Sequence, residues 1–300
     1  EGNNADNSVV SSKKHCTLIV LSKELKMLQK FEFHKTERKI LVKSIITAID
    51  AVRPRDFYFP GEMHNFWEIV CVAEGAAMAT ADERVYNLKK GDLLFHKPME
   101  FHRVWSAEGT APRLFIISFE ADSDGTEYFC DRLFTLNDLM LEEFAEINAA
   151  CRRAIELYDN NKMKEYAWQS NLAAVMLEAF LLRLRGEKET AYYDDSRYAA
   201  IYRQIVNYLE NACCRSITVE ETARACNLSV SSLKRIFKMF CDKGVIEYHN
   251  SIRMRMAVKL LGDGKSIAEV SEDLGFSSTS YFHVAFKRAA GVSPGKLFKS

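Results

Sequence analysis

The stretch from Arg253 to Phe298, RMRMAVKLLGDGKSIAEVSEDLGFSSTSYFHVAFKRAAGVSPGKLF, decides the fold of the C-terminal part of the chain. It contains Ser266-Ile-Ala-Glu269, an S-x-x-E capping box in which the two polar side chains satisfy free backbone N–H groups at a helix start. We therefore expect a helix to begin at Ile267. After about two turns, Gly275 tolerates the positive φ that lets the chain reverse direction.

A second helix is expected after this reversal, with Ser277 or Ser278 as its N-cap and an end at Gly291. Phe282 and Phe286 are four residues apart and therefore share its buried face. Two short helices joined by a sharp turn form a helix-turn-helix. The outward face of the second helix carries Thr279, Ser280, His283 and Lys287.

The same pattern occurs once more upstream. Thr218-Val-Glu-Glu221 is a second capping box, and it lies 48 residues before the first. Asn227 takes the place of Gly275, and asparagine is the other residue that tolerates the left-handed region. Phe237 lies 49 residues before Phe286. The sequence therefore predicts two copies of a helix-turn-helix unit.

The second helix of the upstream unit has a polar face suited to reading DNA. Leu233, Ile236 and Phe237 are expected to face the core, and Arg235 can grip the O6 and N7 atoms of guanine with two hydrogen bonds. Lys234 can donate to guanine or phosphate, and Lys238 to the backbone. The recognition face is predicted to consist of Ser231, Lys234, Arg235 and Lys238.

These motifs together resemble the AraC family of bacterial transcription regulators. The resemblance covers roughly residues 200 to 298 and rests on the A-x2-LL of Ala257 to Leu261, on SIAEVSEDLGF, on SYF-x3-F-KR and on G-x-SP. The run from Phe237 to Gly244 is about two residues longer than in the family. The resemblance implies double-stranded DNA and RNA polymerase as partners, and two recognition helices in successive major grooves about 34 Å apart.

The two units are expected to be unequal. Where the family often places an arginine after the SYF run, this chain has Val284 preceded by His283. Bidentate guanine contacts are then available only to Arg235. We expect the second unit to act chiefly as a clamp on the DNA backbone, through Lys287 and Arg288.

Charge divides the chain into two parts. Residues 197–300 carry 16 Lys and Arg and 9 Asp and Glu, a net charge of +7. Residues 1–196 carry 25 Lys and Arg and 32 Asp and Glu, a net charge of −7, so the chain as a whole has a net charge of zero. A basic half suits phosphate contact, although a solvated basic face is the alternative. No secretory or membrane segment is apparent, which predicts a cytoplasmic protein. The eight cysteines lack the spacing of a zinc site.

Short aromatic and β-branched runs separated by turns extend from Pro54 to Glu120 and predict a β-barrel or jelly roll. The segment resembles the cupin domains found at the N-terminus of many AraC-family regulators. The resemblance rests on His64-x3-Glu68-x6-Gly75 and on the run from Gly91 through Pro98 to His102.

A small-molecule site is predicted in this domain. If residues 62 to 68 form one strand, alternate side chains share a face and line one cavity. The alternatives are a structural polar cluster at a barrel mouth and a metal site. Because the resemblance calls for a third imidazole where Glu62 stands, we assign no metal and no cofactor. The predicted effector-binding residues are Glu62, His64, Phe66, Glu68 and His102.

Two helices should follow. An apolar stripe runs from Met140 to Tyr158, and a second helix from about Lys164 to Arg185 is apolar over more of its surface than one partner needs. This helix is predicted to pack on the barrel with one face and on a second protomer with the other, with Leu177 and Leu181 at the dimer contact. The alternative is that all of it is internal packing.

The sequence thus predicts an α+β multidomain chain with a cupin-like barrel or jelly roll, a helical dimerisation segment and an all-α domain of two helix-turn-helix units. The chain would function as a non-enzymatic transcription regulator that senses an effector and forms a homodimer. One rival is a metal-dependent cupin enzyme fused to a DNA-binding domain, and another is an architectural DNA-binding protein with a ligand-blind barrel. The expected divisions are residues 1–16 (disordered tail), 17–136 (cupin-like), 137–186 (helical), 187–196 (linker) and 197–300 (DNA-binding).

Overall fold

The structure is a computed structural model that describes residues 15–18, 29–32, 34–190, 194, 196–290 and 293–297. Residues 1–39 and 40–300 form two units. The first unit contains an antiparallel hairpin of β1 (His15–Leu18) and β2 (Gln29–Glu32). The predicted disordered tail therefore extends too far, because His15 and Cys16 belong to a strand. Residues 1–14 lie outside the described residues.

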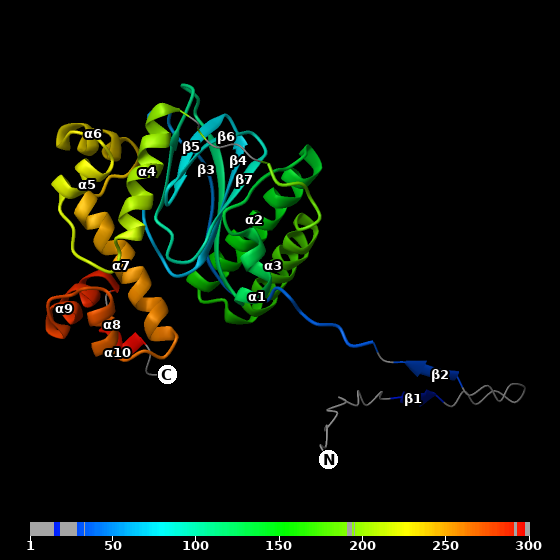
Figure 1. The fold of residues 1–300 in the computed structure, drawn as a ribbon. Coiled ribbons are helices and arrows are strands. Elements are labelled where there is room, and N and C mark those ends of the chain that lie inside the picture. Colours follow the sequence, from blue (N-terminus) through cyan, green and yellow to red (C-terminus); the bar gives the residue numbers. More distant parts are fainter. Residues whose placement is uncertain are drawn as a thin grey trace, which may run out of the picture. The chain divides into compact units, whose positions relative to one another are not determined.

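The second unit begins with a domain of two antiparallel sheets, called here the sheet domain (residues 40–190; Figure 1). The five-stranded sheet has the order β10-β7-β4-β9-β3, and the three-stranded sheet has the order β6-β5-β8. Their strands are β3 (Val42–Val52), β4 (Trp67–Glu74), β5 (Ala76–Ala81), β6 (Arg84–Lys89), β7 (Asp92–His96), β8 (His102–Ser106), β9 (Arg113–Ala121) and β10 (Leu133–Thr135).

The two sheets pack face to face through one apolar core. Val70, Leu94 and Leu114 of the larger sheet meet Ala79 and Leu88 of the smaller sheet, and all five are buried. Among the described strands, no ladder joins the two sheets into one closed cylinder. The domain is therefore the two-sheet form of the predicted barrel or jelly roll, and the closed barrel is wrong.

Helices α2 (Asp138–Asp159) and α3 (Met163–Leu184) cover the other face of the five-stranded sheet (Figure 1). Asn137 caps α2 by accepting a hydrogen bond from the backbone N–H of Met140. Between β9 and β10 lie the short helices α1 (Ser123–Thr126) and η1 (Glu127–Phe129). Phe144 and Ile147 of α2 are fully buried against the sheet, as their spacing predicted.

The orientation of α3 differs from the prediction. Leu177 and Leu181 are fully buried in the core under the sheet, so they cannot form a dimer contact. The exposed face instead carries Trp168, Leu172 and Val175, which are 80%, 52% and 46% exposed. Because α3 is apolar on both sides, its sequence pattern alone could not show which side meets the sheet.

The helical domain (residues 196–297) contains the two predicted units (Figure 1). Both capping boxes are formed as predicted, and Asn227 and Gly275 have φ values of 55° and 65°. A Cβ at Gly275 would lie 2.5 Å from the carbonyl oxygen of Cys214, so only glycine fits this turn. The helices are α4 (Arg197–Asn211), α5 (Val219–Ala225), α6 (Val230–Phe240), α7 (Val245–Gly262), α8 (Ile267–Asp273), α9 (Thr279–Ala290) and α10 (Pro294–Leu297).

Helix α7 connects the two units. Helices α4, α5 and α6 pack together at its beginning, and α8 and α9 pack against its later turns (Figure 1). Its 18 residues span about 27 Å at 1.5 Å per residue. The longer run after Phe237 is accommodated by a loop of residues 241–244, which follows the end of α6 at Phe240.

Candidate functional site

Helix α6 presents the predicted polar face to solvent. Its buried side is formed by Leu233, Ile236, Phe237 and Phe240, as predicted. Arg235 lies 5.4 Å from the ring centroid of Tyr198, a residue of α4, and this contact holds the guanidinium beside the helix while leaving it exposed. The exposed residues of the predicted face are Ser231, Lys234, Arg235 and Lys238.

Helix α9 has a less basic outer face. Phe282 and Phe286 are fully buried, as predicted, and Ser278 caps the helix by accepting a hydrogen bond from the N–H of Tyr281. Thr279, Ser280, Lys287 and Arg288 are exposed, and His283 is half-buried. Tyr281 and Val284 add exposed apolar surface, 56% and 68% exposed.

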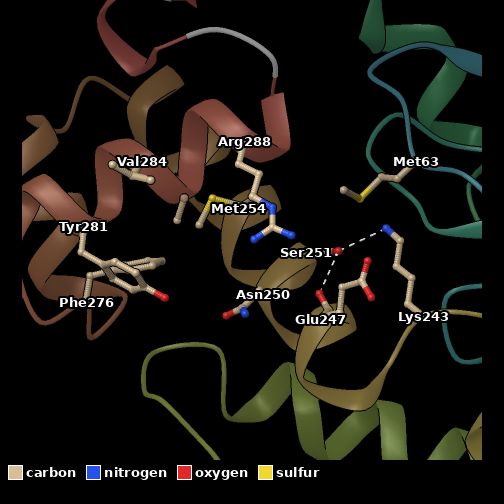
Figure 2. Close-up of a pocket in the computed structure, with 11 residues that line it drawn as sticks. Met63, Lys243, Glu247, Asn250, Ser251, Met254, Phe276, Tyr281, Val284 and Arg288 are labelled. Carbon is tan, nitrogen blue, oxygen red and sulfur yellow. Dashed lines mark hydrogen bonds between the residues drawn. The ribbon is translucent and has the colours of Figure 1, made fainter.

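Arg288 also lines a hollow beside α9. Figure 2 shows its side chain in a hollow between α9 and α7, with Val284 and Met254 nearby and Met63 of the sheet domain opposite. The hollow has a volume of about 600 Å³. At its far side, Lys243 Nζ donates to Ser251 Oγ at 3.3 Å. The predicted role of Lys287 and Arg288 as a backbone clamp stays a prediction.

A smaller cavity, called here the sheet cavity, lies inside the sheet domain. It has a volume of about 210 Å³ and includes four of the five predicted effector residues in its lining. The fifth, His64, lies beside it, with Nε2 3.7 Å from Glu68 Oε2. The lining residues are Thr47, Ile49, Arg53, Phe57, Phe59, Glu62, Phe66, Glu68, Val70, His96, His102, Arg103, Val104, Ile116 and Ser118.

The predicted single strand over residues 62 to 68 is wrong. Strand β4 begins at Trp67, so residues 62 to 66 do not alternate along one strand with Glu68. Glu62 instead forms an isolated bridge with His102, in which each backbone N–H donates to the other's carbonyl. His64 and Phe66 lie between the bridge and the strand, and their rings stack with centroids 3.7 Å apart.

Electrostatics in the cavity centre on Glu68. Its carboxylate accepts a hydrogen bond from Ser118 Oγ at 2.8 Å and lies 3.4 Å from His102 Nε2. Burial opposes ionisation, but the imidazoles of His102 and His64 outweigh burial and lower the pKa of Glu68 well below its usual value. Burial disfavours a charged His102, but Glu68 outweighs this effect and raises the pKa of that imidazole.

Sequence reasoning missed five polar residues of the cavity lining: Thr47, Arg53, His96, Arg103 and Ser118. Ser118, on β9, bonds Glu68 and also lies 2.7 Å from Thr47 Oγ1. The ring of His96 stacks on His102 with centroids 4.3 Å apart, and burial followed by the charge of His102 lowers the pKa of His96 well below its usual value. The alternation of polar residues within β9 was the available signal for Ser118.

The sheet domain also contacts the helical domain through Asp82, a buried residue in the turn between β5 and β6. Arg255 of α7 donates to its carboxylate at 2.5 Å, and Tyr248 of α7 donates at 3.2 Å. Tyr202 of α4 donates to the backbone carbonyl of Asp82 at 3.1 Å. Arg255 also pairs with Glu210, so the contact joins three charged side chains.

Both neighbours of the cavity residue His102 face the helical domain. The Phe101 ring meets the Tyr248 ring edge-on at 5.5 Å, and its backbone N–H donates to Asp82. Arg103 lies 4.6 Å from the ring of Trp105 and donates to the carbonyl of Met239, in α6, at 3.4 Å. One short segment therefore contacts the cavity, the first recognition helix and α7.

Two helix-turn-helix units with exposed basic side chains, joined to a domain that encloses a small cavity with polar and apolar lining, define a DNA-binding protein with a ligand-binding domain. Two family models match the chain: an AraC-like ligand binding domain over residues 46–130 and a helix-turn-helix domain over residues 222–300. The chain belongs to the AraC family of DNA-binding transcription regulators with a ligand-binding domain.

Two transcription regulators are similar to most of this chain. The uncharacterized HTH-type transcriptional regulator YdeC of Bacillus subtilis (strain 168) is 25% identical over 264 residues, which are 79% of this chain and 85% of the relative. The Msm operon regulatory protein of Streptococcus mutans is 25% identical over 252 residues, 82% of this chain and 88% of the relative. The solved C-terminal domain of AraT, a response regulator from Geobacillus stearothermophilus, is 33% identical, with 34% of this chain and 85% of that chain covered and a TM-score of 0.32.

The described part of the chain contains no helix with the length and apolar character needed to span a membrane.

Proposed function

We propose that the sheet cavity binds a small effector with one polar and one apolar end, and that its occupancy alters DNA binding through the segment from Phe101 to Arg103. The observation that carries this proposal is the position of His102. Its side chain lines the cavity, while the side chains on either side of it contact α7 and α6. A ligand that moves His102 therefore also moves two contacts with the helical domain.

The cavity limits the size and chemistry of the effector. Its 210 Å³ is below the roughly 300–1,000 Å³ of sites for drug-sized ligands. Apolar walls from Phe57, Phe59 and Ile116 surround a polar end formed by Glu68 and His102. A small molecule with one polar and one apolar end fits this lining. A regulatory role, without turnover, is supported by the relatives, which are transcription regulators.

For DNA reading, we propose that the first unit supplies most base contacts. Arg235 is the only arginine among the exposed predicted contacts of α6, and the predicted base-reading positions of α9 carry Thr279, Ser280 and the half-buried His283. Arginine is the side chain best suited to guanine. In this proposal Lys287 contacts the DNA backbone. The protein acts in the cytoplasm, where DNA and RNA polymerase are found.

Dimerisation is proposed through the exposed face of α3. Trp168, Leu172 and Val175 lie three to four residues apart and are all at least 46% exposed. Side chains at this spacing form one stripe along a helix. An exposed apolar stripe of this kind is typical of protein–protein contacts, and a second copy of α3 would cover it.

A thermal-shift screen of small metabolites on the full chain tests the effector site. A true effector should raise the melting temperature of the wild type and change its affinity for DNA selected from a random duplex pool. Both effects should be lost in Glu68→Gln. The matched control is Glu120→Gln, which changes an exposed carboxylate of β9. A compound that changes DNA affinity equally in the wild type and Glu68→Gln would contradict the proposed site.

A further inference from the structure

We propose that Glu62, His64, Glu68 and His102 bind one divalent transition-metal ion at the polar end of the sheet cavity. One donor atom from each of these four side chains lies within 4.8 Å of all the others. The sequence alone assigned no metal, because Glu62 stands where the resemblance calls for an imidazole. In the structure the Glu62 carboxylate is itself one of the four converging groups. This inference goes beyond the proposed effector sensing and does not depend on it.

The two histidines are oriented as metal ligands are. His64 Nδ1 lies 3.0 Å from the backbone carbonyl of Phe66, and His102 Nδ1 lies 3.1 Å from that of Glu100. A carbonyl only accepts, so each Nδ1 must carry the proton. Once the ring is neutral, as metal binding requires, Nε2 has a free lone pair, and the same carbonyl contact fixes the direction of the ring.

Both Nε2 atoms are buried and make no hydrogen bond. The His102 side chain is only 3% exposed, and its Nε2 lies 3.4 Å from Glu68 and 3.9 Å from Glu62. The Nε2 of His64 lies 3.7 Å from the other oxygen of Glu68. A buried nitrogen without a partner is costly, so a further group between these atoms would satisfy several of them at once.

The spacings fit a shared ion better than direct hydrogen bonds. Two of the three nitrogen–oxygen separations exceed 3.5 Å, and hydrogen bonds in proteins span roughly 2.7–3.2 Å. Two ligands that each lie about 2.1 Å from one ion are roughly 3.0–4.2 Å apart, depending on the angle between them. All three separations fall in that range.

The donor set indicates the class of ion. Two imidazole nitrogens with two carboxylates suit borderline ions such as Zn²⁺, Mn²⁺ or Fe²⁺. Ca²⁺ and Mg²⁺ prefer oxygen ligands throughout, and Cu⁺ prefers sulfur. Because Glu62, Glu68 and His102 also line the cavity, an ion held by them would face its interior. It would offset the two carboxylates and let the cavity accept an oxygen donor from a small molecule.

Zinc is the probe for this site. Full-length protein without a polyhistidine tag is stripped with EDTA and dialysed against Zn²⁺, and bound metal is measured by elemental analysis. We expect one zinc ion per chain, with affinity falling as pH decreases because the imidazoles must be deprotonated to bind. Cobalt(II) uptake, followed by visible absorption, gives a second readout of coordination by nitrogen and oxygen.

Two variants test the ligands. His102→Gln removes a buried donor, and Glu62→Gln changes a side chain that is 50% exposed, so the second variant should fold even if the first does not. Each should weaken zinc binding by at least about tenfold. His283→Gln, which removes an imidazole on α9, should bind zinc as the wild type does. Absence of bound zinc, or affinity that neither variant changes, would overturn the site. DNA binding by the same samples is measured separately, so it distinguishes loss of the metal site from loss of the regulator's function.

Discussion

Arg255, which lies in the helical domain, should stabilise the sheet domain through its contact with Asp82. The side chain of Asp82 is 5% exposed and that of Arg255 is 23% exposed, and the two are joined at 2.5 Å. Hydrogen bonds to charged groups contribute about 1.5–3 kcal/mol, so we take about 2 kcal/mol for this contact. Arg255→Gln should therefore destabilise the sheet domain by about 2 kcal/mol, or roughly thirtyfold in its unfolding equilibrium.

Tryptophan fluorescence provides the assay. All three tryptophans, Trp67, Trp105 and Trp168, lie in the sheet domain, so urea unfolding followed by their emission reports on that domain. With a urea dependence of about 2 kcal/mol per molar, the predicted change lowers the midpoint by about 1 M. The affected residue lies in α7, outside the domain that is observed. A shift therefore measures coupling between the two domains.

Arg253→Gln is the matched control. Arg253 lies on the same helix but donates to the carbonyl of Leu274, inside the helical domain. It should leave the tryptophan-reported midpoint unchanged. In a double-mutant cycle, the variant that carries both Asp82→Asn and Arg255→Gln should lose little more unfolding free energy than either single variant. An unchanged midpoint in Arg255→Gln, or an equal shift in Arg253→Gln, would refute the coupling.

Three further predictions concern assembly, DNA reading and pH. Trp168→Glu should convert a dimer into a folded monomer in light scattering, whereas Leu177→Glu should unfold the protein; a monomeric wild type would contradict the dimer. Arg235→Ala should relax base preference at one position by about 1–3 kcal/mol, and Lys287→Ala should weaken binding to all sequences and lower the salt slope by about one; stronger base preference under α9 would contradict this. Burial opposes ionisation of Asp131, but Arg84 and Lys97 outweigh burial and lower the pKa of the Asp131 carboxyl group. These ion pairs therefore stabilise the fold above the unfolded-state pKa of about 3.9, and this stabilisation is lost as pH falls. Asp131→Asn should lower the melting temperature at neutral pH, and a difference that persists at about pH 2 would contradict the ion pairs.

The helix-turn-helix units could be predicted because their determinants are local. Each capping box spans four residues, and Asn227 and Gly275 mark the reversals through their backbone conformation alone. The buried residues Phe282 and Phe286 follow from helical spacing. These signals act within about 25 residues, so tertiary packing does not need to be known.

The rest depends on contacts between distant parts of the chain. Asp82 and Arg255 are 173 residues apart, and no local pattern predicts that they meet. The cavity residues were found through a motif, but Glu62 reaches the site through its bridge to His102 rather than through strand alternation. For α3, burial of Leu177 rather than Trp168 is set by the sheet against which the helix packs.

Selection of DNA from a random duplex pool by the full-length chain, followed by affinity measurements across salt concentrations, tests the central claim most directly. We expect two short sequence elements about one helical turn, roughly 10 base pairs, apart, with the stronger base preference in the element read by the first unit. Affinity for the selected DNA should fall steeply as salt rises, because Lys and Arg contacts to phosphate release counterions. A pool that yields no enriched sequence, or binding that does not change with salt, would contradict the account.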